Sequence, residues 1–252
     1  MAANECFLDS STLRENVVSL ARNIGYVPRS RRSSRARISF NISEITETVT
    51  ATVRAGIICN GSAANTSYIF SIPEDITVPV VDGVAVFDNI EIYEGTLINQ
   101  NFTVNTSQFN QRYILSNSFI DTSTIRVKVK PDESSSSTVT YQQIDNVVGV
   151  TSTSSSYLLQ EIEDERYELI FGDNVIGKKL SNDNYITVSY IITSGKDGNG
   201  ASEFSFIGSI IDQDGATIDA SNFSLVTTEE SSRDGDEIES ISSIKYYAPR
   251  IY

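Results

Sequence analysis

Apolar and polar residues alternate with a period of two along most of this chain, which is the pattern of a half-buried β-strand. The clearest run spans residues 124–130, where the inward-facing Ile125, Val127 and Val129 alternate with the outward-facing Arg126, Lys128 and Lys130. Shorter runs of the same kind predict strands at 37–42, 48–54, 83–87, 103–105, 185–192 and 203–207, and a hairpin over 161–171. The pattern therefore predicts a mainly β (α+β) protein made of antiparallel units.

The period changes to that of a helix near the N-terminus, over residues 12–24. Thr12 and Glu15 have the spacing of a capping box, in which each side chain bonds the backbone N–H of the other residue. Gly25 suits the left-handed position that ends a helix, and Pro28 follows soon after.

A second, shorter helix is predicted over residues 236–246. Ile238 and Ile241 share a face, Lys245 stands in the last turn where it complements the helix dipole, and Pro249 ends the helix.

Breaks in the pattern divide the chain into four predicted parts. Pro131 and the serine run 134–137 interrupt the β pattern in the middle of the chain. The predicted parts are an N-terminal helix with a basic arm (1–37), a first β domain (38–130), a second β domain (131–228) and a C-terminal helix with an end that looks truncated (229–252).

Charge is distributed unevenly around the formal net value of −14. Residues 1–37 hold seven Arg and three acidic residues, whereas the rest of the chain has a net charge of −18. Five Arg fall in ten residues, at Arg29, Arg31, Arg32, Arg35 and Arg37. This segment, here called the arm, is interpreted either as a solvated connector or as a contact with an acidic neighbour, such as another copy of the chain. Nucleic acid is not expected as a partner, because the body is acidic and no aromatic residue is interleaved with these Arg.

The composition narrows the possible chemistry. The chain has no histidine, which excludes histidine-dependent nucleophilic catalysis and His-ligated metals, and it has only two cysteines, Cys6 and Cys59. Carboxylate-only glycoside hydrolysis remains open, with Glu161, Glu163, Asp164 and Glu165 as candidates. A charge run at a hairpin tip is more often a solvated face, so we expect neither an enzyme nor a cofactor.

Residues 171–180, Phe-Gly-Asp-Asn-Val-Ile-Gly-Lys-Lys-Leu, form the most conspicuous motif. Its Gly-x-x-x-x-Gly-Lys spacing is that of a phosphate loop, but the Ser or Thr and the helix that should follow are missing. We interpret Phe171, Gly172, Asp173 and Gly177 as a structural motif, a tight turn leading into a bent β segment. The Asp-Gly pairs near 197–200 and 212–215 are likewise interpreted as turns rather than calcium loops.

The order of these motifs resembles a known family. Residues 7–30 (Phe-Leu-Asp-Ser-Ser-Thr-Leu-Arg-Glu-Asn onward), 167–180, 190–206 and 247–252 are similar to segments of the baseplate wedge subunits of T-even-like contractile-tail phages, in the baseplate J-like family. Asn174 stands where that family usually has Gly, a mild departure because Asn tolerates the left-handed conformation. Residues 38–130 match by type only, and family members are much longer, so the resemblance implies missing N- and C-terminal regions.

The resemblance implies a structural role without an active site. Such a protein would assemble in the host cytoplasm into the virion's tail baseplate, pair with a second copy or a ring of copies, and bind other wedge proteins, with no membrane as partner. Expected interface residues are Arg29, Arg31, Arg32, Arg35, Arg37, Ile241 and Tyr247.

A secreted or virion-surface β-sandwich adhesin that binds glycans is the alternative. It is suggested by the abundance of Ser, Thr and Asn and by six N-x-S/T sequons, at Asn41, Asn60, Asn65, Asn101, Asn105 and Asn222. The N-terminus lacks the basic and apolar regions of a signal peptide, which disfavours secretion.

Overall fold

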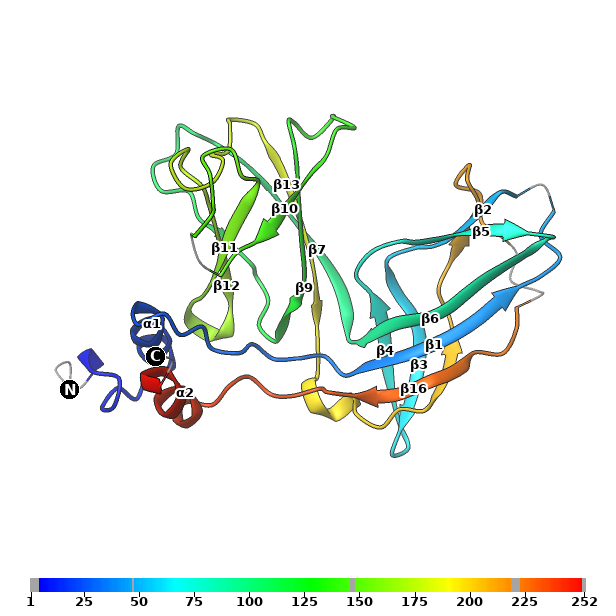
Figure 1. Ribbon diagram of the computed structural model, residues 1–252, viewed down its shortest axis with the longest axis horizontal. Coiled ribbons are helices and arrows are strands. Elements are labelled where there is room, and N and C mark those ends of the chain that lie inside the picture. Colours follow the sequence, from blue (N-terminus) through cyan, green and yellow to red (C-terminus); the bar gives the residue numbers. More distant parts are fainter. Residues whose placement is uncertain (1–4, 47, 146–147, 219–222, 251–252) are drawn as a thin grey trace.

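The computed structural model describes residues 5–46, 48–145, 148–218 and 223–250, so Asn222 and the last two residues of the 247–252 segment lie outside the described part. It shows two β-sheets side by side and a pair of helices packed below the second sheet (Figure 1). The predicted mainly β fold, with an N-terminal helix and a short C-terminal helix, is confirmed.

The first sheet contains nine strands of the described chain, all paired antiparallel. They are β1 (Arg35–Ile42), β2 (Thr50–Val53), β3 (Gly56–Ala63), β4 (Thr66–Ile72), β5 (Ile76–Val81), β6 (Val84–Glu94), β14 (Glu203–Phe206), β15 (Ile210–Ile211) and β16 (Thr227–Arg233). The long β6 pairs with β5 at its start, with β4 at its end and with β1 along most of its length. The core of this sheet centres on Phe40, whose ring lies 4.9 Å from that of Phe87 and 5.0 Å from that of Phe206.

The second sheet contains seven strands and its own apolar core. They are β7 (Thr96–Thr103), β8 (Tyr113–Ile114), β9 (Ile120–Lys130), β10 (Val139–Gln143), β11 (Ser156–Glu161), β12 (Tyr167–Phe171) and β13 (Tyr185–Ile192). In β9 the predicted alternation is confirmed, with Ile125, Val127 and Val129 buried. The hairpin predicted over 161–171 is also confirmed, with a short 3-10 turn at Glu163–Glu165 between β11 and β12. One pair, β10 with β11, is parallel, which the expectation of antiparallel units did not include.

The sheets do not follow the predicted division at residue 130. Strands β7 and β9, which lie before that point, belong to the second sheet, while β14, β15 and β16 return to the first. Pro131 and the serine run lie in the hairpin loop between β9 and β10, whose Val129 and Val139 are paired. Alternation reveals which face of a strand is buried but not which strand is its neighbour, so the pattern could not show that strands from both sides of residue 130 share each sheet. The second sheet is inserted into the first.

The helix pair consists of α1 (Arg14–Asn23) and α2 (Ile241–Tyr247) and has a small core of its own. The predicted capping box is wrong, because the Thr12 hydroxyl donates to Glu5 and not to the helix. Glu5 also accepts from the amides of Thr12 and Leu13, so an acidic side chain seven or eight residues upstream binds the backbone at the N-terminal end of α1. The C-terminal end of α1 forms as predicted, with Gly25 in the left-handed region at φ +87°.

The helix predicted over 236–246 begins later than expected, at Ile241. Ser240 caps it by accepting from the amide of Ser243, at 3.2 Å. Asp236 and Glu239, which fall within the predicted range, lie before the helix and have other partners.

Gly95 lies where the chain crosses from β6 in the first sheet to β7 in the second. Its φ is +124°, and a Cβ atom placed there would lie 2.1 Å from the carbonyl oxygen of Ile192. The carbonyl oxygen of Ile192 belongs to the backbone and cannot move aside as the end of a flexible side chain can, so only glycine fits at position 95.

We predict that Gly95→Ala lowers the free energy of unfolding by about 2–4 kcal/mol, because backbone strain and steric overlap add. Gly56→Ala is the matched control, since Gly56 has φ +122° but open space around a Cβ. Urea denaturation of both variants checks this. Equal destabilisation by the two substitutions would show that steric overlap at Gly95 contributes nothing.

Candidate interaction surface

The arm runs beside the C-terminal segment 234–240 in an antiparallel arrangement, between the helix pair and the first sheet (Figure 1). The amide of Arg32 donates to the carbonyl of Asp236 at 3.0 Å, and the amide of Asp236 donates back at 3.1 Å. The amide of Glu239 donates to the carbonyl of Arg29 at 3.0 Å. The arm is therefore an ordered part of the fold, and its interpretation as a solvated connector is wrong.

Side chains of the arm pair with acidic residues of the same chain. Arg29 lies 2.8 Å from Asp236, and Arg31 lies 2.6 Å from Glu237 while its guanidinium stands over the ring of Phe119. The acidic neighbour expected for the arm is thus supplied in part by the chain's own C-terminal segment.

Further along, the arm becomes β1, where Arg35 and Arg37 contact the first sheet and Arg35 also donates to the Ser123 hydroxyl of the second sheet, at 3.2 Å. Arg35 stands over the ring of Tyr93, and Arg37 pairs with Glu91 at 3.3 Å and with Glu230 at 3.7 Å. Arg32 is half-buried. A contact of these five Arg with another protein stays a prediction.

Glu239 joins the arm to both helices. One carboxylate oxygen accepts from the Tyr26 hydroxyl and from the Ser243 hydroxyl, each at 2.7 Å, and the other accepts from the amide of Arg29 at 2.9 Å. Burial by itself would raise the pKa of this carboxyl group, but the hydrogen bonds from Arg29, Ser243 and Tyr26 outweigh burial and lower it. Burial, with Glu239 as neighbour, raises the pKa of Tyr26 to about 12.

Arg14 links the helix pair to the second sheet through an ion pair. Its guanidinium makes a two-point contact with Glu161 at the end of β11, at 2.6 and 3.2 Å, and also donates to the carbonyl of Glu239. The Glu161 side chain is 6% exposed, so its interpretation as part of a solvated charge run is wrong. Burial raises the pKa of Glu161 even though Arg14 acts to lower it.

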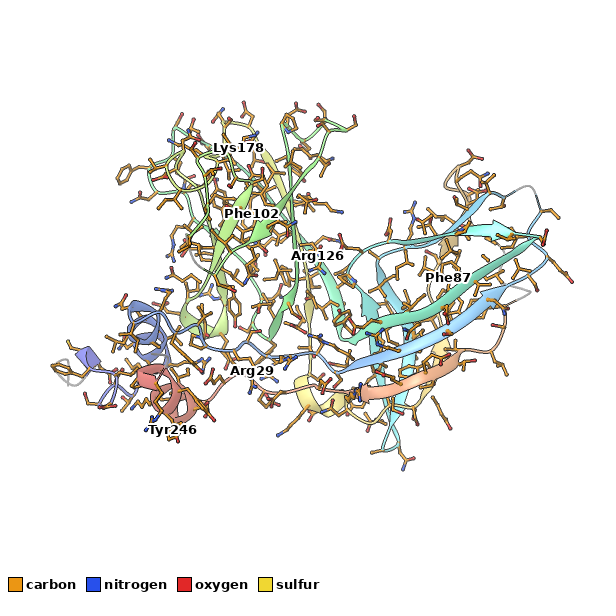
Figure 2. The ribbon with its side chains drawn as sticks, viewed as in Figure 1. Arg29, Phe87, Phe102, Arg126, Lys178 and Tyr246 are labelled. Carbon is orange, nitrogen blue, oxygen red and sulfur yellow. The ribbon has the colours of Figure 1, made fainter. Side chains whose placement is uncertain are left out.

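Large apolar and aromatic side chains are exposed on α2 and in the segment just before α1. The exposed fractions are 69% for Phe7, 50% for Leu13, 56% for Tyr246 and 55% for Tyr247. Tyr246 lies on the side of α2 that faces away from the second sheet (Figure 2). Aromatic residues are enriched at protein interfaces because a rigid ring supplies contact area at low entropic cost.

The two apolar residues predicted for an interface differ in placement. Tyr247 is exposed, and its ring packs edge-on against that of Tyr246 at 5.0 Å. Ile241 is half-buried against the core of the helix pair, so much of its apolar surface is used within the chain.

The motif at 171–177 forms a closed loop at the far end of the second sheet. The Asp173 side chain accepts from the amides of Val175 and Ile176, each at 2.9 Å, and these bonds lower its pKa. Gly172 and Gly177 approach so closely that a Cβ on Gly172 would lie 2.2 Å from the carbonyl carbon of Gly177. The predicted tight turn is present, but residues 172–184 form turns and loops rather than a bent β segment.

Sequence reasoning missed the roles of Glu239, Glu161 and Glu5. The signal available was the contrast between a basic arm and acidic residues at 234–239, which indicates attraction between them. No period or spacing connects Glu5 to the start of α1, or Arg14 to Glu161, because these contacts depend on packing.

A scan against protein-family models finds no match, and a search of curated proteins finds none. Over the described residues, no helix is long and apolar enough to cross a membrane. Asn41, Asn60, Asn65, Asn101 and Asn105 of the sequons are exposed.

We predict that Glu239→Gln loosens the junction of the arm with the helix pair. In the variant one carboxylate oxygen becomes an N–H₂ group, which cannot accept the hydrogen bonds that Glu239 accepts on both of its oxygens. The loss destabilises the junction by about 1–3 kcal/mol. Amide hydrogen exchange over residues 26–33 and 241–250 should become about 10- to 100-fold faster. Glu237→Gln is the control, since the Glu237 side chain is 40% exposed and Glu239 is buried. Equal exchange in the two variants would contradict the role of Glu239.

The lowered pKa of Glu239 also predicts a direction for the effect of pH. A carboxyl group with a lowered pKa in the folded state stabilises it above its ordinary pKa of 4.5, and that stabilisation is lost as pH falls through the folded-state value. Protection factors at the junction should therefore fall on acidification in the parent protein. In Glu239→Gln this part of the fall should be absent, and an unchanged profile in that variant would count against the assignment.

Proposed function

We propose that this protein is a structural subunit of a contractile-tail baseplate wedge, in which the helix pair contacts another protein subunit. The observation that carries this proposal is the exposure of Tyr246 and Tyr247 on α2, with Phe7 and Leu13 exposed just before α1, on a helix pair that Arg14 and Glu161 join to the second sheet. Such a surface resembles the aromatic-rich centre of a protein interface more than an ordinary solvated face.

The support beneath the helix pair suits a mechanical role. The pair is joined to the second sheet through Arg14 and Glu161 and to the arm through Glu239. Force or displacement at the helix pair would pass to both sheets through buried charged hydrogen bonds, which are among the stronger polar contacts in proteins. The resemblance of residues 7–30 and 167–180 to baseplate wedge subunits gives this role its biological setting.

We expect the double variant Tyr246→Ser/Tyr247→Ser to weaken association with a second copy or with the proteins encoded by neighbouring genes. Loss of two central aromatic side chains from an interface reduces affinity by about 10- to 1,000-fold. Sedimentation velocity over a range of concentrations, alone and with each neighbouring protein, measures the effect.

A matched control is Tyr68→Ser, a partly buried Tyr in the first sheet, far from the helix pair. Monomeric behaviour of the parent protein at all concentrations, together with no complex with any neighbouring protein, would overturn the proposal. An association that the double variant leaves unchanged would place the interface elsewhere.

A further inference from the structure

The two end strands of the second sheet are joined by side chains and not by a backbone ladder. The strand order of this sheet begins at β7 and ends at β8, and over the described residues no ladder pairs these two strands. Hydrogen bonds from two glutamine side chains connect them instead, from Gln100 in β7 and from Gln111 just before β8. The line along which residues 100–105 and 111–116 face each other is here called the seam.

Gln100 binds the opposite edge of the seam as a neighbouring strand would. Its Nε2 atom donates to the carbonyl of Ile114 and its Oε1 atom accepts from the amide of Ser116, each at 2.9 Å. The amide of Leu115, between them, donates to the carbonyl of Tyr167 in β12, on the other side of the strand. A carbonyl and an amide that flank one residue in this way are the groups that a strand pairs in a ladder. The carboxamide of Gln100 therefore stands in for the backbone of a strand.

Gln111 makes the same pair of contacts in the reverse direction. Its Nε2 atom donates to the carbonyl of Thr103 and its Oε1 atom accepts from the amide of Asn105, each at 2.8 Å. The amide of Val104, between them, donates to the carbonyl of Asn184 on the other side. A strand edge with free carbonyls and amides readily adds another strand. At the seam two such edges face each other, and each is occupied by one side chain that a backbone can replace.

The width of the seam is close to that of one absent strand. A glutamine side chain spans about 5 Å from its Cα to its amide group when extended, and a hydrogen bond adds about 3 Å. Bridges of this length separate two strands by about 8 Å. Neighbouring strands in a ladder lie about 4.8 Å apart, so two strands with a third between them lie about 9.6 Å apart. A small widening of the seam would therefore admit one extended strand.

A pocket of about 430 Å³ adjoins the seam beside β8. The rings of Tyr113 and Phe171 belong to its lining, together with side-chain amides of the loop between β7 and β8. Of its charged groups, Glu168 is paired with Arg112 at 2.6 Å, and Lys179 is exposed to water. An added strand would thus meet rings and amide groups at this end of the seam, which favours an uncharged segment.

We propose that the seam takes up an extended, uncharged segment of a partner protein as an added β-strand, whose backbone replaces the carboxamides of Gln100 and Gln111. The occupant is a strand because the seam offers alternate carbonyls and amides from two facing edges, which is the basis of recognition by strand addition. The inference does not rest on the proposed function, because the seam lies in the second sheet and uses no residue of the helix pair.

The peptide acetyl-Thr-Val-Thr-Val-Thr amide is a suitable probe, because it is uncharged and its β-branched residues favour an extended strand. In an NMR titration we expect amide shifts to change at residues 103–105 and 114–116, and the side-chain amide signals of Gln100 and Gln111 to move as both are released. The same peptide with N-methyl groups on its valines lacks backbone donors and should bind about 10-fold more weakly or less. No shift at millimolar peptide, or equal binding of the N-methylated peptide, would overturn the proposal.

Gln111→Ala removes one competing carboxamide and leaves the carbonyl of Thr103 and the amide of Asn105 open to the peptide. We expect this variant to bind the peptide about 3- to 30-fold more tightly than the parent protein does. Gln111 is chosen because Gln100 also accepts from the hydroxyl of the buried Tyr190, at 3.1 Å. Unchanged or weaker binding, measured well below the unfolding temperature of the variant, would contradict replacement of the carboxamide.

Gln142→Ala is the matched control, because Gln142 is an exposed glutamine of β10 outside the seam. Its affinity for the peptide should equal that of the parent protein, and tighter binding to this variant as well would contradict a site at the seam.

A last measurement distinguishes a partner protein from a second copy of this chain. Without peptide, Gln111→Ala should sediment as the parent protein does over a range of concentrations, because no segment of a second copy is assigned to the seam. Stronger self-association of this variant, reversed by the peptide, would overturn the assignment to a different protein and place a second copy in the seam.

Discussion

Buried carboxylates that accept hydrogen bonds from backbone amides join the two sheets, the arm and the helix pair of this protein. Glu94, at the end of β6, accepts from the Thr193 hydroxyl at 2.5 Å and from the amide of Ser194 at 3.0 Å. Asp121 accepts from the amide of Ser33 at 2.9 Å, and Glu239 accepts from that of Arg29. Each bond joins segments that are distant in the sequence. A buried charge is costly without such partners, so these carboxylates bind their segments only in the native arrangement.

Insertion of the second sheet into the first makes these junctions necessary. The chain leaves the first sheet at Gly95 and returns to it through the short 3-10 turn Gly195–Gly198. The two connections between the sheets therefore pass through the same place. A Cβ on Gly198 would lie 2.5 Å from the Cγ atom of Glu94, which shows how closely the two crossings pack. The sheets are therefore linked by two tight crossings and by the arm, rather than by one flexible linker.

The helix pair has a different kind of support. Its own apolar core is small, with five buried residues, so a large share of its stability must come from contacts with the rest of the chain. Arg14, Glu161 and Glu239 supply these contacts, while Tyr246 and Tyr247 of α2 stay more than half exposed and the Arg250 guanidinium stands over the Tyr246 ring.

The sequence by itself determined the local features of this protein. Period-two alternation located β9 and β13 because a strand at a core must present one apolar face, and Gly25 and Pro28 fixed the end of α1 through backbone geometry. The tight loop at Gly172 and Asp173 followed from residue chemistry alone. Tertiary structure decided which strands share a sheet, why Pro131 lies in a hairpin, and where Glu5, Glu161 and the arm find partners. The physical reason is that alternation and capping act within a few residues, whereas strand pairing and buried ion pairs join positions whose distance in space no local pattern records.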